Sequence, residues 1–117
     1  MTLDVLFAGI PVSDFDGAVA WYERCWGRPP DVDVNDDEVM WKVTDTAWVY
    51  VILAEPRAGK ALLAIAVPDL EAMITELGQR GIGAAPIEQV GDAGRKATVT
   101  DLEGNQIDFI EVASRLG

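Results

Sequence analysis

Asp108 is the side chain whose type and surroundings best suit it for chemistry. It alternates with Ile107 and Phe109 along a predicted strand, so one face is apolar and the other carries a carboxylate. That carboxylate could neutralise a cationic ligand, or serve as a general base if burial made it more basic. It could equally form a structural ion pair with Arg95 or Lys96 on the preceding strand. The sequence leaves these roles open.

A tight turn comes directly before this strand, at Asp101 to Asn105. Gly104 and Asn105 are residue types that tolerate positive φ in a hairpin turn. The remaining pattern predicts two helices, one beginning after Ser13 or Asp14 and one after Pro68-Asp69. Strands are expected at 5–12, 31–38 (a weak edge strand with its loop), 39–43, 47–53, 61–67, 86–90 and 95–100.

The two halves of the chain are a repeat. Val12-Ser-Asp14-Phe matches Val67-Pro-Asp69-Leu 55 positions later, and each match opens a helix. With the closing Asp-x-x-Gly-Asn hairpin, this pattern resembles the vicinal oxygen chelate superfamily, which includes glyoxalase I, bleomycin-binding proteins and extradiol dioxygenases. The resemblance implies an α+β fold of two tandem βαβββ modules whose curved mixed sheet surrounds a cavity. We expect a single domain over 1–117, with modules near 1–54 and 61–117 and a linker at 55–60.

Metal-dependent members of that superfamily carry ligands on the first and last strands of each module. The usual histidine positions, seven residues before each helix-starting aspartate, are Phe7 and Leu62 here. The position that usually holds a glutamate holds Asp108 here, and the corresponding position of the first module holds Tyr50. Transition metals generally need imidazole or thiolate ligands, and the chain has no histidine. We therefore expect no metal and no cofactor, although an oxygen-only Mg²⁺ or Mn²⁺ arrangement stays open.

Alternation along the strands turns the side chains at these positions to the inner face of each sheet. Because several of them are aromatic, the pattern predicts an aromatic ligand pocket instead of a metal site. Ligand sites are typically apolar with a few convergent polar groups. Alternatively, Phe7 and Leu62 simply fill a collapsed cavity. Cys25 is expected in the core as a small hydrophobe. The candidate ligand-binding residues are Phe7, Gly9, Trp48, Tyr50, Ile52, Leu62, Ala64 and Asp108.

Composition excludes several classes of function. Nine basic and twenty acidic residues give a net charge of −11, which opposes nucleic-acid binding. No apolar run approaches the roughly 20 residues of a membrane span, and no signal peptide is visible. We therefore expect a cytoplasmic protein that contacts neither nucleic acid nor membrane.

Two functions compete on this evidence. The first is a metal-free binding protein that holds an aromatic or cationic small molecule, as bleomycin-binding proteins do. The second is a metal-independent lyase or isomerase that uses Asp108 as base and Tyr50 as proton donor. A metal-dependent lyase or dioxygenase is opposed by the missing histidines. Between the first two functions the sequence hardly discriminates, because one carboxylate can serve as base or as counter-ion, and binding is the function we favour. Relatives of this length commonly pair, so a two-fold homodimer is expected.

Overall fold

A computed structural model describes residues 1–113 of the chain, and residues 114–117, at the end of the expected second module, lie outside the described residues. The chain divides into two compact units. Unit 1 contains residues 1–61 together with the turn at 101–105, and unit 2 contains the described residues 62–100 and 106–113. The first unit therefore includes a short segment that is distant in sequence.

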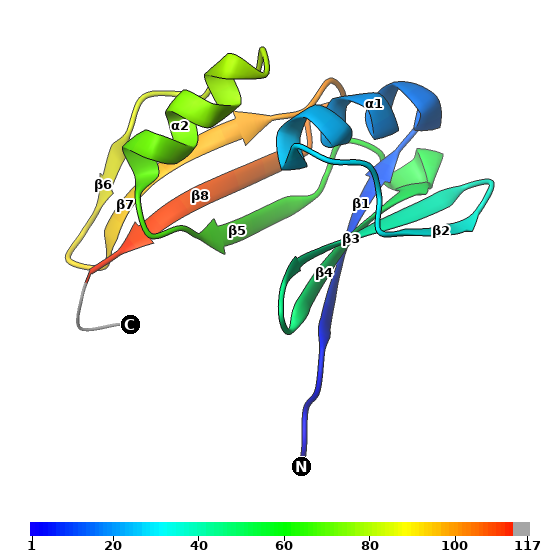
Figure 1. The fold of residues 1–117 in the computed structure, drawn as a ribbon, viewed down its shortest axis with the longest axis horizontal. Coiled ribbons are helices and arrows are strands. Elements are labelled where there is room, and N and C mark those ends of the chain that lie inside the picture. Colours follow the sequence, from blue (N-terminus) through cyan, green and yellow to red (C-terminus); the bar gives the residue numbers. More distant parts are fainter. Residues whose placement is uncertain (114–117) are drawn as a thin grey trace. The chain divides into compact units, whose positions relative to one another are not determined.

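Unit 1 has the order β-α-β-β-β (Figure 1). Its elements are β1 (Leu6–Val12), α1 (Phe15–Trp26), β2 (Val32–Asn35), β3 (Glu38–Thr44), β4 (Ala47–Leu53) and a short 3₁₀ turn, η1 (Glu55–Arg57). The sheet order is β1-β4-β3-β2, with β1 parallel to β4 and the other neighbours antiparallel. Helix α1 covers one face of this sheet.

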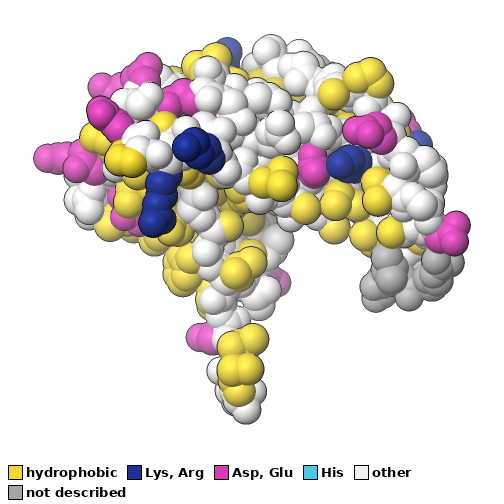
Figure 2. Space-filling view, turned by 180° about the vertical axis from the view of Figure 1, so that it is seen from behind, with side chains coloured by type: hydrophobic (Ala, Val, Ile, Leu, Met, Phe, Trp, Pro, Cys, Tyr) yellow, Lys and Arg dark blue, Asp and Glu magenta, His cyan; other side chains and the backbone are white. Residues whose placement is uncertain are grey.

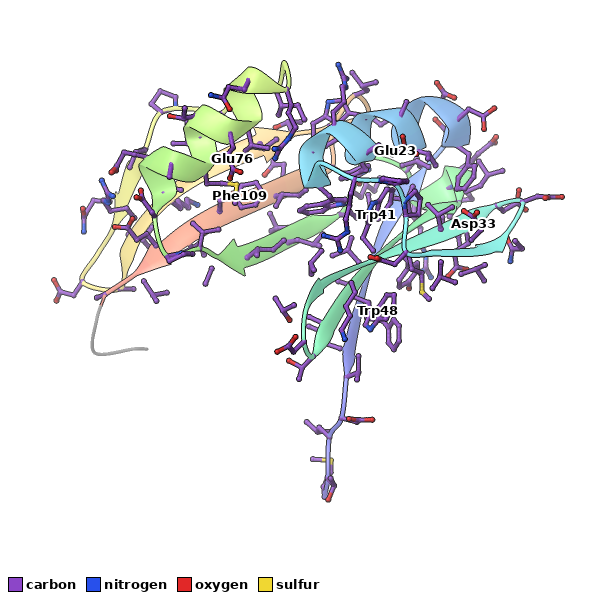
Figure 3. The ribbon with its side chains drawn as sticks, in the orientation of Figure 1. Glu23, Asp33, Trp41, Trp48, Glu76 and Phe109 are labelled. Carbon is purple, nitrogen blue, oxygen red and sulfur yellow. The ribbon has the colours of Figure 1, made fainter. Side chains whose placement is uncertain are left out.

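The core of unit 1 lies between α1 and the sheet. Strand alternation turns Ile10, Val49 and Val51 toward the helix, where each is buried. Trp41 is fully buried there too, and Figure 3 shows it between α1 and the strands. Cys25 is buried as expected. The opposite face of the sheet, which no helix covers in unit 1, is called the open face below.

Unit 2 repeats the same order. Its elements are β5 (Leu62–Ala66), α2 (Leu70–Gln79), β6 (Glu88–Val90), β7 (Gly94–Thr100) and β8 (Gln106–Val112). The sheet order is β5-β8-β7-β6, again with the first pair parallel. Leu70 and Leu77 of α2 and Ile107 and Phe109 of β8 are buried, and Figure 3 shows Phe109 beneath α2.

The structure confirms the α+β fold of two βαβββ modules. Asp14 and Asp69 each cap a helix, accepting hydrogen bonds from the amides of Gly17 and Ala72. None of the helices among residues 1–113 is long and apolar enough to cross a membrane.

Three local features refine the expectations from the sequence. The strand expected at 86–90 is limited to Glu88–Val90, because Pro86 has no amide proton for the ladder. The segment expected as a linker at 55–60 contains the η1 turn, which the sequence pattern did not specify. In the 101–105 turn only Gly104 has positive φ, whereas Asn105 has negative φ and a buried side chain.

Candidate functional site

The open face of unit 1 carries rows of paired residues from β1 and β4. The parallel register places Phe7 beside Trp48 and Gly9 beside Tyr50. Strand alternation turns these residues away from α1, and Figure 3 shows Trp48 on the side of the sheet opposite the helix. The Phe7 and Trp48 rings stack, with centroids 6.2 Å apart and an interplanar angle of 22°.

In the next row the Tyr50 ring lies directly over Gly9. A Cβ atom built on Gly9 falls 2.6 Å from Cζ and 2.7 Å from the hydroxyl oxygen of Tyr50. Such distances lie well inside van der Waals contact, so any side chain at position 9 must displace the ring. Glycine is therefore required here by the close approach of an aromatic ring.

A cavity of about 390 Å³ begins at this ring. The sheet contributes apolar lining, and the chain after β4 contributes the other wall. That wall includes two basic side chains, Arg57 and Lys60. The complete lining is Gly9, Pro11, Tyr50, Ile52, Ala54, Arg57, Lys60 and Ala61.

The charge of this cavity is opposite in sign to that of the protein. Figure 2 shows more acidic than basic side chains on the visible face, in line with the twenty acidic and nine basic residues of the chain. The cavity lining nevertheless holds two cations and no carboxylate. Neither Arg57 nor Lys60 forms an ion pair with a carboxylate of residues 1–113. Both cations are exposed.

Asn105 holds the segment that carries these cations. Its side-chain oxygen accepts a hydrogen bond from the Ala61 amide (2.8 Å), and its amide nitrogen donates to the Pro11 carbonyl (2.9 Å). Gly59 packs against the Glu103 carbonyl oxygen and has a φ of 80°. The turn at 101–105 thus ties Ala61, at the end of this segment, to Pro11 of β1.

Asp101 anchors this turn to α1. Its carboxylate accepts hydrogen bonds from the Tyr22 hydroxyl (2.8 Å), the Asn105 side chain (2.9 Å) and the backbone amides of Glu103 (2.8 Å) and Asn105 (3.0 Å). Burial, together with the adjacent Asp101 carboxylate, raises the pKa of Tyr22 far above its usual range, so the phenol stays a donor.

Glu103 attaches the same turn to the start of α1. Its carboxylate accepts hydrogen bonds from the Ser13 hydroxyl (2.7 Å) and from the amides of Ser13 (2.7 Å) and Asp14 (3.0 Å). Burial alone raises the pKa of Glu103, but these three donors outweigh it and hold the pKa below its usual range. The carboxylate is therefore ionised at neutral pH, where it accepts all three bonds.

The other candidate residues, Leu62, Ala64 and Asp108, lie on the sheet of unit 2. Ala64 pairs with Asp108 as Gly9 pairs with Tyr50, so Asp108 and Tyr50 occupy equivalent positions of the repeat. Leu62 is 72% exposed, and Ala64 is exposed too.

Asp108 has partners within its own sheet. Its carboxylate accepts a hydrogen bond from the Thr98 hydroxyl (2.6 Å) and lies 3.6 Å from the Lys96 ammonium. Arg95, the other expected partner, instead pairs with Glu111 (2.9 Å) and Glu71. Of the roles left open by the sequence, the structural ion pair is the one observed.

The described part of the chain holds no group of three histidine, cysteine, aspartate or glutamate side chains close enough to share a metal ion. The residue types at the expected ligand positions explain why no such group forms there. Phe7 and Leu62 offer no donor atom, and Asp108 is already paired. These residues do not fit a transition metal, which needs nitrogen or sulfur ligands.

Sequence reasoning placed Gly9, Tyr50 and Ile52 at a binding face, and all three line the cavity. Phe7 and Trp48 lie one row further along the same face, outside the lining. Arg57 and Lys60 were missed, because the segment was interpreted as a linker. The sequence did contain one signal for them. Arg57 and Lys60 lie within four positions of each other, although the acidic chain has only nine basic residues.

No protein-family model matches the sequence, and no curated protein does. Among solved structures, a glyoxalase/bleomycin resistance protein from Catenulispora acidiphila is 33% identical, with a TM-score of 0.87 over 95% of this chain and 100% of the other. A bleomycin-binding protein from Streptomyces verticillus, complexed with copper(II)-bleomycin, is 19% identical, with a TM-score of 0.77 over 97% and 98% of the chains. An antibiotic-binding protein from a Streptomyces species is 21% identical, with a TM-score of 0.76 over 97% and 98%.

The last two similarities concern the fold alone. The similarity to the Catenulispora acidiphila protein shows the family as well as the fold, because 33% sequence identity extends over 95% of this chain. It agrees with the repeated helix-capping aspartates and with the two βαβββ modules described above. The chain belongs to the glyoxalase/bleomycin resistance family of the vicinal oxygen chelate superfamily.

Proposed function

We propose that this chain binds a planar aromatic small molecule in the cavity of unit 1, without a metal of its own and without catalysing a reaction. One observation carries the proposal: the Tyr50 ring lies over Gly9 and forms part of the wall of a cavity of about 390 Å³. Ligand pockets typically measure about 300–1,000 Å³ and are mainly apolar. Size and lining are both appropriate for an aromatic ligand.

The relatives support binding as the type of function. The Streptomyces verticillus protein binds bleomycin, and the other Streptomyces protein binds an antibiotic. Both share the fold of this chain at low sequence identity, so neither identifies the ligand here. The aromatic character is inferred from Tyr50 and Ile52, whose faces suit a flat apolar molecule. A stacked aromatic pair contributes about 0.5–1.5 kcal/mol beyond the burial of apolar area.

The enzymatic alternative finds less support. It needs Asp108 as a free base, and the Asp108 carboxylate is engaged by Thr98 and Lys96. The same contacts weaken the expectation of a cationic ligand, because Lys96 already balances the negative charge. An uncharged aromatic group therefore accounts for the apolar part of the cavity better than a cation does.

The test is a titration with naphthamide, a neutral planar aromatic, followed by amide NMR. We expect the amide signals of Gly9, Ile52 and Ala54 to move. Tyr50→Ala should weaken binding by about 1.5–3 kcal/mol, the value of burying a large apolar side chain. Val34→Ala, at an exposed apolar residue of β2 outside the cavity lining, is the matched control and should change nothing. Equal affinity of the two variants contradicts the assignment of the cavity.

We also infer that the functional form is a two-fold homodimer. Leu6 is 65% exposed and Leu62 is 72% exposed, so each sheet presents a large apolar side chain to solvent. Such residues mark contact surfaces when they gather in patches. Light scattering at tens of micromolar is expected to give the mass of two chains, and a monomer mass contradicts the inference.

A further inference from the structure

We infer that the ligand of the unit 1 cavity carries an anionic group, a carboxylate or a phosphate, which Arg57 and Lys60 bind. This inference rests on the proposed function, because it assigns a charge class to the ligand of that cavity. Its basis is the presence of one aromatic ring, that of Tyr50, and two cations in a single lining that holds no acidic side chain. The sequence alone had favoured an aromatic or cationic ligand.

The two cations are available to a ligand. Neither forms an ion pair with a described carboxylate, and both are exposed at the cavity. A guanidinium presents parallel N–H donors that match the oxygens of a carboxylate or phosphate. The ammonium of Lys60 supplies a compact second charge on a flexible stem. Together they resemble the few convergent polar groups that orient a ligand in a mainly apolar pocket.

The segment that carries Arg57 and Lys60 is held in place by hydrogen bonds. This order indicates that the two cations belong to the cavity and are not unrelated charges on a loose surface loop. The backbone amide of Gly59 donates to the Pro11 carbonyl, and the Lys60 amide donates to the Arg57 carbonyl, each at 3.3 Å. The fully buried Asn105 then fixes Ala61. A short segment tied at both ends presents its side chains from a defined backbone, so less ordering is needed when a ligand binds.

The net charge of −11 opposes an anionic ligand only at long range. The Debye length is about 8 Å at physiological ionic strength, so carboxylates spread over the surface are largely screened from the cavity. Two cations in direct contact with the ligand are screened far less. The local pair therefore decides which charge the cavity accepts, while the acidic surface slows the approach of anions.

The test compares three probes of one shape: naphthoate, naphthyl phosphate and the neutral naphthamide. We expect at least one anion to bind about tenfold tighter than naphthamide, as a hydrogen bond to a charged group requires. Whichever anion is tighter identifies the group. Raising the salt concentration should weaken the anion and leave naphthamide unchanged.

Arg57→Gln and Lys60→Gln remove each charge while keeping much of the side-chain length. Each should weaken the preferred anion by about five- to tenfold and change naphthamide by less than about twofold. Arg24→Gln, which removes a positive charge from α1 outside the cavity lining, controls for the overall charge of the protein and should have no effect. All three positions are exposed, so the variants are expected to fold, and their amide spectra verify it.

The two proposals fail in different ways. If naphthamide and both anions bind at the cavity with equal affinity, the charge inference is overturned and the proposed function stands. If the charge-removing variants weaken the anions no more than Arg24→Gln does, the inference is equally overturned. If none of the three probes moves the signals of Gly9 and Ile52, the proposed function fails and the inference fails with it.

Discussion

Removing the Tyr22 hydroxyl tests how firmly the 101–105 turn is attached to unit 1. Tyr22→Phe keeps the ring in its cluster, where it contacts Trp21 at a centroid distance of 4.7 Å and Trp41 at 6.4 Å. Only the hydrogen bond to Asp101 is lost. Because both residues are buried, water cannot readily replace the missing donor.

The expected magnitude follows from the number of donors around Asp101. Its carboxylate accepts four hydrogen bonds, of which three remain in the variant. A hydrogen bond to a charged group contributes about 1.5–3 kcal/mol, and we expect the free energy of unfolding to fall by that amount. With a urea m-value of roughly 1–3 kcal/mol/M, the midpoint of unfolding should fall by about 1 M.

The assay is urea unfolding followed by tryptophan fluorescence. Tyr50→Phe is the matched control, since no hydrogen bond of the Tyr50 hydroxyl to residues 1–113 is observed, and it should change stability by less than about 0.5 kcal/mol. A double-mutant cycle with Asp101→Asn isolates the pair. If Tyr22→Phe is no more destabilising than Tyr50→Phe, the hydroxyl does not anchor the turn and the reasoning is refuted.

Three further predictions follow from the site. Gly9→Ala should displace the Tyr50 ring and weaken naphthamide binding. Gly78→Ala, at an open position on α2, is the control and should leave binding unchanged. Equal binding by both variants contradicts the close approach of the Tyr50 ring to Gly9. Asp108→Asn should change the affinity of a cationic aromatic by less than about twofold, because Lys96 already pairs with the carboxylate; a loss of about 1.5–3 kcal/mol restores the cation-binding role. Added Ni²⁺, Zn²⁺ or Fe²⁺ should leave the melting temperature of tag-free protein unchanged, since a metal that binds the native state stabilises it, and one equivalent by elemental analysis contradicts this.

The repeat and the alternation of the strands were readable from the sequence because both depend on local spacing. Asp14 and Asp69 cap helices in their own vicinity, and Ile107 and Phe109 alternate within one strand. The parity that placed Tyr50 and Ile52 on one face needs no knowledge of distant contacts. These features follow from the period of the secondary structure alone.

The cavity wall at 57–61 was not predictable in the same way. It has no periodic pattern, and its position depends on Asn105, which lies 44 residues from Ala61 and 94 from Pro11. The pattern Gly104-Asn105 indicated a turn built from residue types that tolerate positive φ, without saying which of the two adopts it. Gly104 alone provides it, which leaves the Asn105 side chain free to cross-link two distant backbone segments. A single sequence contains no signal for such a partner.

The family resemblance and the cavity lead to one electrostatic argument about how this chain meets its ligand. In metal-dependent members of the superfamily, the four ligand positions place a cation on the sheets. Here those positions hold Phe7, Leu62, Tyr50 and an Asp108 that Lys96 balances. On our proposal, positive charge comes instead from Arg57 and Lys60, beside the ring of Tyr50. Side-chain cations can hold an anionic group without the open coordination positions of a metal, so on this proposal the positive charge of the cavity serves to bind and orient the ligand.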